Sequence, residues 1–333
     1  MATKEAIVHF IEKPEGGEAK ISPRQSLLTN NPSLDDLISK VSAAYNKRAG
    51  KIYGGFEEDG QEYPFGGWLK SYVDGELDLL QFGNATLTRF KQMLDEQTEA
   101  FSGYLLFARQ EVLEVDQLLL LVLSTSPAVI IDDQLELNEA HHLELGKVQL
   151  GAKVNLDEWS KGTGTQFISF VKSRSGKEIS ESFRRCIGST EEVDSKAQTQ
   201  TLLKVFNDYC SDADLPSGQA SAVKQKAYEY CNEQVESGNR VHLQELSCVM
   251  DTSDPDKFYN YASEQEVDLK SEIPADRGGL KKFVRYSGSM KGMSLSFSEM
   301  LLGEQILYDA DTDTLTIRGV PPTLKKQLSR NKS

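Results

Sequence analysis

The glycine-containing segment at residues 146–153 has the residue spacing of a phosphate-binding loop. Gly146 and Gly151 are separated like the two glycines of a P-loop. That motif needs lysine directly after the second glycine and then serine or threonine, so that an ammonium and a hydroxyl reach phosphate and magnesium. Here Ala152 intervenes, and Val154 follows Lys153. Because the segment also has the pattern of a strand, we predict no nucleotide site and no cofactor.

Three aspartates near the C-terminus resemble the start of a calcium loop. Asp309, Asp311 and Asp313 alternate as the first ligands of such a loop do. The pattern then needs a turn glycine, where Thr314 stands, and a bidentate glutamate, where Val320 stands. We therefore interpret the aspartates as caps of a tight hairpin turn and predict no calcium site.

Two adjacent histidines have acidic neighbours and are the residue types of a metal-dependent nuclease. Neighbouring residues on a strand point to opposite faces, so His141 and His142 are poorly placed to share an ion. A serine or cysteine nucleophile would need a base, and no spacing among the four histidines singles one out. We predict no catalytic residue and no metal site, and a nuclease is the most distant alternative.

The four cysteines are Cys186, Cys210, Cys231 and Cys248, and no two of them form a C-x-x-C pair. Zinc ribbons and thioredoxin-type redox sites therefore have no support. Cys210 and Cys231 fall on apolar helical stripes. We predict that the cysteines are reduced packing residues in a cytosolic protein.

Basic segments are the more informative feature of the chain. Residues 277–291 and residues 318–333 each hold five positive side chains and no acid. A third run, residues 172–185, holds Lys172, Arg174, Lys177 and two further arginines against two glutamates. Such clusters bind nucleic acid by neutralising phosphates and releasing counterions. The predicted contact residues are Arg277, Lys281, Lys282, Arg285, Lys291, Arg184, Arg185, Lys325 and Lys326. The alternative interpretation is that these segments dock on the acidic first half of the chain.

The net charge of −14 does not exclude a DNA partner, because the charge is unevenly distributed. Residues 1–150 hold 13 basic against 24 acidic side chains, whereas residues 151–333 hold 24 against 27. No segment has the length of a membrane span, and the first residues lack the pattern of a secretory signal. We expect a cytoplasmic protein that makes no use of a membrane.

The elements that must position these residues follow from apolar periodicity. In the first half we predict a strand at residues 6–11, helices at 33–48 and 87–99, and strands of an antiparallel sheet at 103–108, 112–123, 129–137 and 143–154. Residues 53–68 are expected to form an ordered loop. Asn155 and Glu158 resemble a helix-capping box, and residues 161–164 a linker.

The second half changes character from helical to β. Residues 165–261 are predicted to be helical, with apolar positions at helical spacing around Phe206 and Cys231. Strands are predicted at 283–287 and 293–297, with a hairpin at 306–317. The fold class is therefore α+β, in three parts: an acidic mixed α/β domain at 1–155 with an antiparallel sheet, a helical region at 156–270, and a small basic region with a β-hairpin at 271–333.

Longer strings of residues resemble one known family. Residues 298–304 (SEMLLGE) and 308–324 (YDADTDTLTIRGVPPTL) are similar to the end of the bacterial nucleoid-associated protein family, a family of acidic proteins of about this length. Residues 155–159, 195–198 and 228–234 are similar too. The resemblance implies association with the nucleoid in the cytoplasm and no enzymatic activity. It supplies no base-reading motif, so the predicted contact residues rest on charge.

We thus predict a bacterial nucleoid protein that organises the chromosome by binding double-stranded DNA, mainly through phosphates and with little sequence preference. The alternative is a non-catalytic adaptor that docks on DNA-handling proteins such as topoisomerases, a partner class inferred from charge. The sequence leaves the oligomeric state open.

Overall fold

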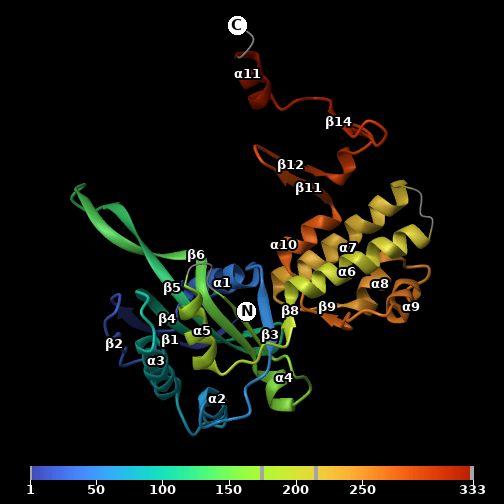
Figure 1. Ribbon diagram of the computed structural model, residues 1–333. Coiled ribbons are helices and arrows are strands. Elements are labelled where there is room, and N and C mark those ends of the chain that lie inside the picture. Colours follow the sequence, from blue (N-terminus) through green and yellow to red (C-terminus); the bar gives the residue numbers. More distant parts are fainter. Residues whose placement is uncertain (1, 173–175, 214–216, 331–333) are drawn as a thin grey trace. The chain divides into compact units, whose positions relative to one another are not determined.

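A computed structural model describes residues 2–172, 176–213 and 217–330 (Figure 1). Arg174 and Lys332, two of the basic residues noted above, lie outside these ranges. The chain divides into two compact units. Unit 1 comprises Met1–Thr199, Gln234–Arg240 and Glu272–Arg277, and unit 2 comprises Gln200–Glu233, Val241–Ser271 and Gly278–Ser333. The three continuous segments expected from the sequence, 1–155, 156–270 and 271–333, stay a prediction.

Unit 1 is built on an antiparallel sheet with the strand order β2-β1-β4-β5-β6-β7-β3-β8. The strands are β1 (Ala2–Lys13), β2 (Lys20–Ser22), β3 (Lys51–Gly54), β4 (Phe101–Val112), β5 (Val115–Ile131), β6 (Leu137–Asn155), β7 (Ile168–Val171) and β8 (Val193–Asp194).

Both faces of this sheet are covered, so its central strands are apolar on both sides. Along β5, Leu118, Leu120 and Val122 belong to one core cluster, and the residues between them belong to the other. This alternation is the period of two that strand geometry imposes. The continuous apolar run at residues 118–123 therefore marks a strand buried on both faces, as the sequence predicted.

Helices of unit 1 supply the cover. Helix α1 (Pro32–Asn46) packs on one face, and α2 (Phe65–Val73), α3 (Leu79–Asp95) and α5 (Lys177–Ile187) on the other. Asn31 caps α1 by accepting a hydrogen bond from the Leu34 amide at 2.9 Å. The short helix α4 (Leu156–Lys161) begins at Asn155, whose side chain accepts from the Glu158 amide at 3.0 Å, as the predicted cap requires.

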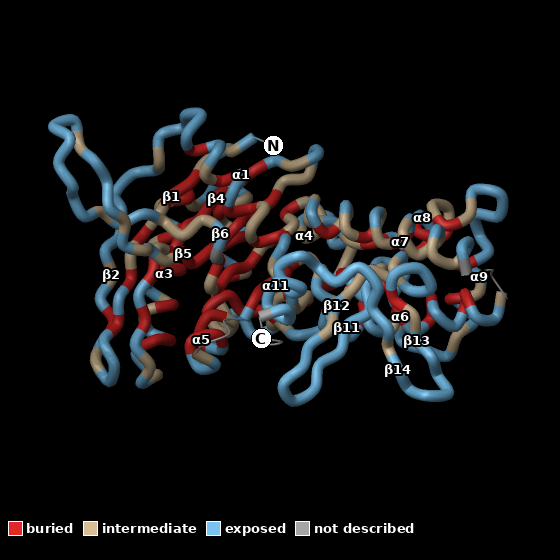
Figure 2. The backbone as a smooth tube through the Cα atoms, turned by 90° about the horizontal axis from the view of Figure 1, so that it is seen from above, coloured by how far each residue is buried: buried red, intermediate tan, exposed pale blue. Residues whose placement is uncertain are grey.

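Strands β5 and β6 run on beyond the covered sheet as an exposed hairpin, which we call the acidic arm (residues 124–144; Figures 1 and 2). Register shifts near Leu123 mark the place where the arm leaves the core. Its turn is closed by Asp132, whose carboxylate accepts from the amides of Gln134 and Glu136 at 2.9 and 3.0 Å. At the tip, apolar side chains remain exposed: Val129, Ile130, Ile131, Leu135 and Leu137.

Unit 2 has a helical core of aromatic residues. Phe206 contacts Phe258 and Phe283, with ring centroids 5.7 and 4.9 Å apart. The elements that contribute to this unit or border it are α6 (Ser195–Asp212), α7 (Ser217–Ser237), β9 (Val241–His242), α8 (Leu243–Met250), α9 (Lys257–Glu264), β10 (Glu272–Ile273), α10 (Arg277–Leu280) and the 3-10 helix η1 (Lys281–Phe283). Two hairpins follow, β11 (Arg285–Met290) with β12 (Met293–Ser298) and β13 (Ile306–Asp309) with β14 (Thr314–Ile317), joined by the 3-10 helix η2 (Glu299–Leu301); α11 (Pro322–Arg330) comes last.

The α+β class is confirmed, and so are the first strand, the first helix, the two strands expected near residues 283–287 and 293–297, and the hairpin at 306–317. Three local predictions are wrong. Residues 129–137, predicted as a separate strand, form the end of β5, the turn and the start of β6. The predicted loop at 53–68 ends in helix α2, and the predicted helical region contains β7, a strand of the main sheet.

Candidate nucleic-acid interface

Two of the predicted cations lie on η1, where helical geometry exposes them. Leu280 and Phe283 are three residues apart, and both are buried in unit 2. One helical turn brings such residues to the same side, so the intervening Lys281 and Lys282 face solvent. The strand begins only at Arg285. The strand predicted at residues 283–287 thus begins two residues later than expected, and Lys281 and Lys282 precede it on η1.

The β11–β12 hairpin continues from η1, and β11 is exposed along its whole length while β12 is partly buried near its end; we call it the basic hairpin (residues 285–298; Figure 2). Its two-residue turn is Lys291-Gly292, and Gly292 has φ +84°, in the left-handed region that favours glycine. Lys291 thus lies at the tip. Arg285 lies at the base and contacts Ser296, with Nη2 3.2 Å from Oγ.

The base of this hairpin is anchored to helix α7 by an ion pair. Lys224 Nζ lies 2.7 Å from Glu299 Oε1, and both side chains are less than one fifth exposed. Residues 277–298 contain no acid, so Glu299 is the first carboxylate along the chain after the basic segment. Because Lys224 neutralises it, Glu299 does not reduce the positive potential of the hairpin.

The predicted cations differ in whether they already have a carboxylate partner. Within the described ranges, Lys281, Lys282, Arg285 and Lys291 form no ion pair, and we call these four the free cations. Arg277 does form one, with Nη2 2.9 Å from Glu236 Oε1 in unit 1. Four of the five positive charges of residues 277–291 are therefore available to an external anion.

The C-terminal basic segment contains helix α11. Lys325 and Lys326 are exposed on it. Leu324 and Leu328, one helical turn apart, are exposed as well, at 45% and 55%. The helix therefore carries both cations and an apolar stripe that nothing in the described part of unit 2 covers.

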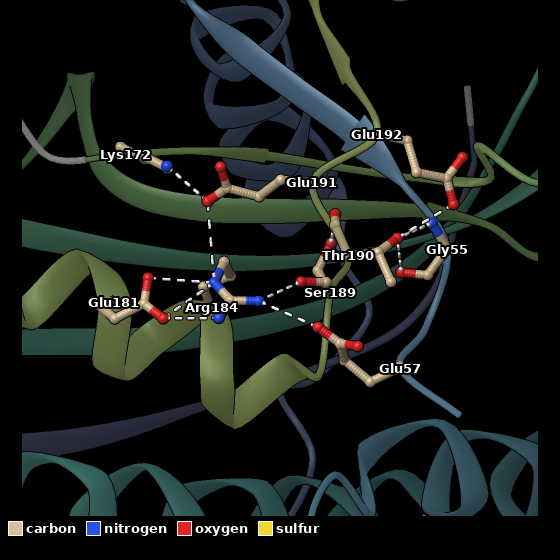
Figure 3. Close-up of polar contacts among 9 residues, drawn as sticks. All are labelled: Gly55, Glu57, Lys172, Glu181, Arg184, Ser189, Thr190, Glu191 and Glu192. Atoms are coloured by element: carbon tan, nitrogen blue, oxygen red, sulfur yellow. Dashed lines mark hydrogen bonds and ion pairs between the residues drawn. The ribbon is translucent and has the colours of Figure 1, made fainter. Parts of the chain in front are cut away.

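The third basic run is arranged differently, because its cations have acidic partners (Figure 3). Arg184 pairs with Glu181 and Glu57, at 2.6 and 3.3 Å, and Nη1 also donates to the Ser189 carbonyl at 2.8 Å. The hydrogen bonds that the Arg184 guanidinium donates to the Glu181 carboxylate lower the pKa of Glu181 and raise the pKa of Arg184. Lys172 lies 2.5 Å from Glu191 in the same network.

Arg185 is also paired, with Glu96 Oε2 2.8 Å from Nη1. The ion pairs of residues 172–185 thus connect helix α5 to the segments around it. The role of Arg184 and Arg185 in DNA contact stays a prediction, and the local pairing makes them weaker candidates than the free cations.

The competing chemical motifs occupy positions that fit structural roles. The P-loop-like segment lies in strand β6, as predicted from its pattern. Asp309 Oδ1 accepts from the amides of Asp311 and Thr312 at 3.0 and 3.3 Å, which is the turn-capping role expected of it. His141 and His142 lie side by side on β6 in the acidic arm. Among the described residues, no three histidine, cysteine or acidic side chains are grouped so as to hold a metal ion.

The cysteines are free thiols, and Cys186, Cys210 and Cys231 are buried. Burial raises the pKa of the Cys186 and Cys231 thiols to about 12, so neither is a thiolate at neutral pH. Of the helices described, none combines the length with the apolar character that crossing a membrane requires.

Some features of the basic hairpin were missed at the level of sequence. Serine occurs at every second position on each strand, which leaves the apolar side chains together on the other face. Serine alternates with apolar residues in 285–298, and this period of two predicts a ribbon with one polar face and one apolar face. The exposed apolar tip of the acidic arm was missed because apolar strings are normally read as buried.

The fold and the charge pattern define an acidic α+β protein that presents cations on an exposed C-terminal hairpin. Residues 7–325 match the family described as nucleoid-associated protein YejK, and the chain belongs to this family. A nucleoid-associated protein of Pseudomonas putida is 36% identical over 334 residues, covering 100% of both chains. Others from Pseudomonas fluorescens and Azotobacter vinelandii are also 36% identical, over 99% or more of each chain. The resemblance noted in the sequence is thereby confirmed, and with it the expected place at the nucleoid of the bacterial cytoplasm.

Proposed function

We propose that the protein is a non-enzymatic nucleoid protein that binds double-stranded DNA directly, mainly through phosphates and with little sequence preference. The observation that supports it is the group of four free cations, Lys281, Lys282, Arg285 and Lys291, on an exposed segment without acids. Cations that have no internal carboxylate retain their full attraction for phosphate. The tail helix, with Lys325 and Lys326, is a second contact of the same kind.

Phosphate contact also accounts for binding by a chain of net charge −14. At physiological salt, interactions between exposed charges are screened beyond about 8 Å, so the hairpin acts through its local charge. Lysine presents a point charge with three rotatable donors, which suits phosphate oxygens, and contacts to phosphate carry no direct sequence information. Low sequence preference follows.

The test is the salt dependence of binding of the purified full-length chain to labelled duplexes of several sequences. Each phosphate neutralised contributes about −0.9 to the slope of log affinity against log salt, so four contacts give about −3.6. Replacing Lys281, Lys282 and Lys291 with alanine should make the slope shallower by about 2.7 and weaken binding similarly on all sequences.

A matched control removes the same charge elsewhere. Lys40, Lys70 and Lys161 are exposed lysines of unit 1, and their replacement by alanine should leave the slope unchanged. If both triple variants change the slope equally, binding reflects net charge alone and the basic hairpin has no special role. If the native chain does not bind purified duplex at low salt, direct DNA binding is wrong.

The acidic arm favours a second candidate, an adaptor that docks on a DNA-handling protein. Five acids, Asp132, Asp133, Glu136, Glu139 and Glu144, surround an exposed apolar tip. Such a surface is complementary to a partner with basic residues around an apolar pocket, and proteins that hold DNA present basic surfaces.

The adaptor role is tested with a purified partner, for example a topoisomerase. Replacing Ile131, Leu135 and Leu137 with serine should weaken that association at least tenfold while leaving the DNA slope unchanged. Ser126→Ala, on the stem of the arm, serves as the control. An association that the serine variant retains in full would exclude the tip as its docking surface.

A further inference from the structure

The basic hairpin has two chemically different faces. Cross-strand partners lie on the same face, and the pairs Tyr286–Phe297, Gly288–Leu295 and Met290–Met293 share one of them. The opposite face holds Arg285 and five serines, Ser287, Ser289, Ser294, Ser296 and Ser298. The ribbon is therefore amphipathic.

Apolar exposure increases toward the tip of this ribbon. Phe297 and Leu295 are partly buried, and the ring centroids of Tyr286 and Phe297 lie 5.6 Å apart. Met290 and Met293, directly paired beside the turn, are 67% and 50% exposed. Two flexible apolar side chains thus project together at the end of a narrow ribbon, with Lys291 between them in sequence.

The charge around the two methionines indicates which class of partner they contact. An apolar protein surface would suit them, but the flanking free cations and the absence of acids in residues 277–298 favour a polyanion. Duplex DNA offers both requirements at once: phosphates along the groove edges and apolar base-pair faces between stacked steps. Methionine is among the side chains that architectural proteins insert between base pairs.

We propose that the basic hairpin enters the minor groove of duplex DNA and that Met290 and Met293 wedge together between adjacent base pairs, bending the duplex. This inference rests on the proposed DNA-binding function. The serine hydroxyls and Arg285 face one groove wall, where they donate to phosphate and sugar oxygens. The minor groove presents a degenerate pattern of base edges, so a ribbon that enters it has little sequence preference.

The wedge is tested by energy transfer between dyes at the two ends of a short duplex. Binding of the native full-length chain should shorten the end-to-end distance and raise transfer. The double variant M290A/M293A should still bind with the native salt slope, because no cation is removed, but it should lose the rise in transfer. A variant that keeps apolar bulk, M290I/M293I, should retain it.

Met300→Ala is the matched control, because Met300 is 71% exposed on η2 but lies outside the ribbon. It should bend DNA like the native chain. Circular dichroism of each variant verifies folding, and all the replaced side chains are exposed.

Two results overturn the wedge and leave direct DNA binding intact. One is salt-dependent binding by the native chain without any rise in transfer, and the other is a full rise with M290A/M293A. Loss of all DNA binding in folded M290A/M293A would contradict the expectation that the cations bind DNA without the methionines, and it would overturn the wedge as argued. A change in sedimentation between the free native chain and free M290A/M293A would assign the methionines to self-association instead. Absence of binding by the native chain refutes the proposed function itself.

Discussion

Replacing Arg184 with alanine should destabilise unit 1 and leave DNA binding unchanged. The side chain is only 16% exposed and is held by Glu181, Glu57 and the Ser189 carbonyl (Figure 3). Its partners come from helix α5, from the segment after β3 and from the segment after α5. The arginine therefore joins helix α5 and the turn that follows it to the segment after β3, which is 127 positions away.

The magnitude follows from these bonds. A hydrogen bond to a charged group contributes roughly 1.5–3 kcal/mol when desolvated, and exposed ion pairs contribute less than about 1 kcal/mol. Glu181 and Glu57 remain partly exposed, at 48% and 33% of their side chains, so removal leaves them hydrated rather than stranded. We expect the free energy of unfolding to fall by about 2 kcal/mol.

Urea unfolding followed by tryptophan fluorescence measures this loss. Trp68 and Trp159 are the only tryptophans of the chain, and both pack against the main core of unit 1. Arg184→Lys keeps the charge but lacks the planar fork, so it should recover only part of the stability. Lys177→Ala, an exposed change in the same helix, is the control and should have little effect.

The reasoning is refuted if Arg184→Ala unfolds at the native urea midpoint while its salt slope on DNA becomes shallower by about 0.9. That pair of results would mean that the arginine contacts phosphate and that its ion pairs contribute nothing to stability.

Three further outcomes are expected. Burial lowers the pKa of His9 to about 4, whereas the residue titrates near 6.5 in the unfolded chain. As the pH falls from 6.5 to 4, the unfolded state therefore binds the proton first, and the free energy of unfolding should fall by up to about 3 kcal/mol. Urea unfolding at a series of pH values measures this loss. Cys231→Ser should lower the free energy of unfolding by about 1–3 kcal/mol and leave DNA affinity unchanged, since the buried thiol has only a packing role. Phe206→Ala should cost unit 2 about 3–5 kcal/mol by thermal circular dichroism, and should also weaken DNA binding because Phe283 holds η1 against it.

Each outcome has its own control. His9→Gln cannot titrate, and the acid-dependent loss should shrink in it; an equal loss would point to another group. Cys231→Ala separates polarity from packing, and any serine variant that folds but fails to bind DNA contradicts the packing role. Tyr308→Ala, an exposed aromatic change in unit 2, should leave both readouts of the Phe206 experiment unaltered.

Sequence periodicity predicted the parts of the fold whose burial is regular. The run at residues 118–123 and the stripe around Phe206 are correct because each is apolar where it is packed. Strand β7 was missed because four residues carry little periodic signal, and its partners β3 and β6 are distant or already paired. Helix α2 was missed because Gly66 and Gly67 lower its intrinsic helix propensity, which tertiary packing of Phe65 and Leu69 overrides.

Only the basic charge of the candidate interface could be predicted from the sequence. Composition singled out residues 277–291 and 318–333, which contain no acid, and residues 172–185, which contain two glutamates. It could not show that Arg184 pairs with Glu57, which is 127 positions away, or that Lys281 and Lys282 form no ion pair within the described residues. Which cations are free depends on long-range packing, and no local pattern encodes that.

The acidic arm is an extension of β5 and β6, which also lie in the middle of the sheet, so it is not an independently folding unit. Because successive side chains of a strand alternate between faces, the length of the arm can change without altering its faces only in steps of two cross-strand pairs. Deleting the successive pairs Ala128–Ala140 and Val129–Glu139 would shorten the arm and keep every remaining side chain on its face. Deleting one pair alone would reverse the faces of all residues between the deletion and the tip. The pleat therefore fixes the increments by which the reach of the arm can change while the core stays the same.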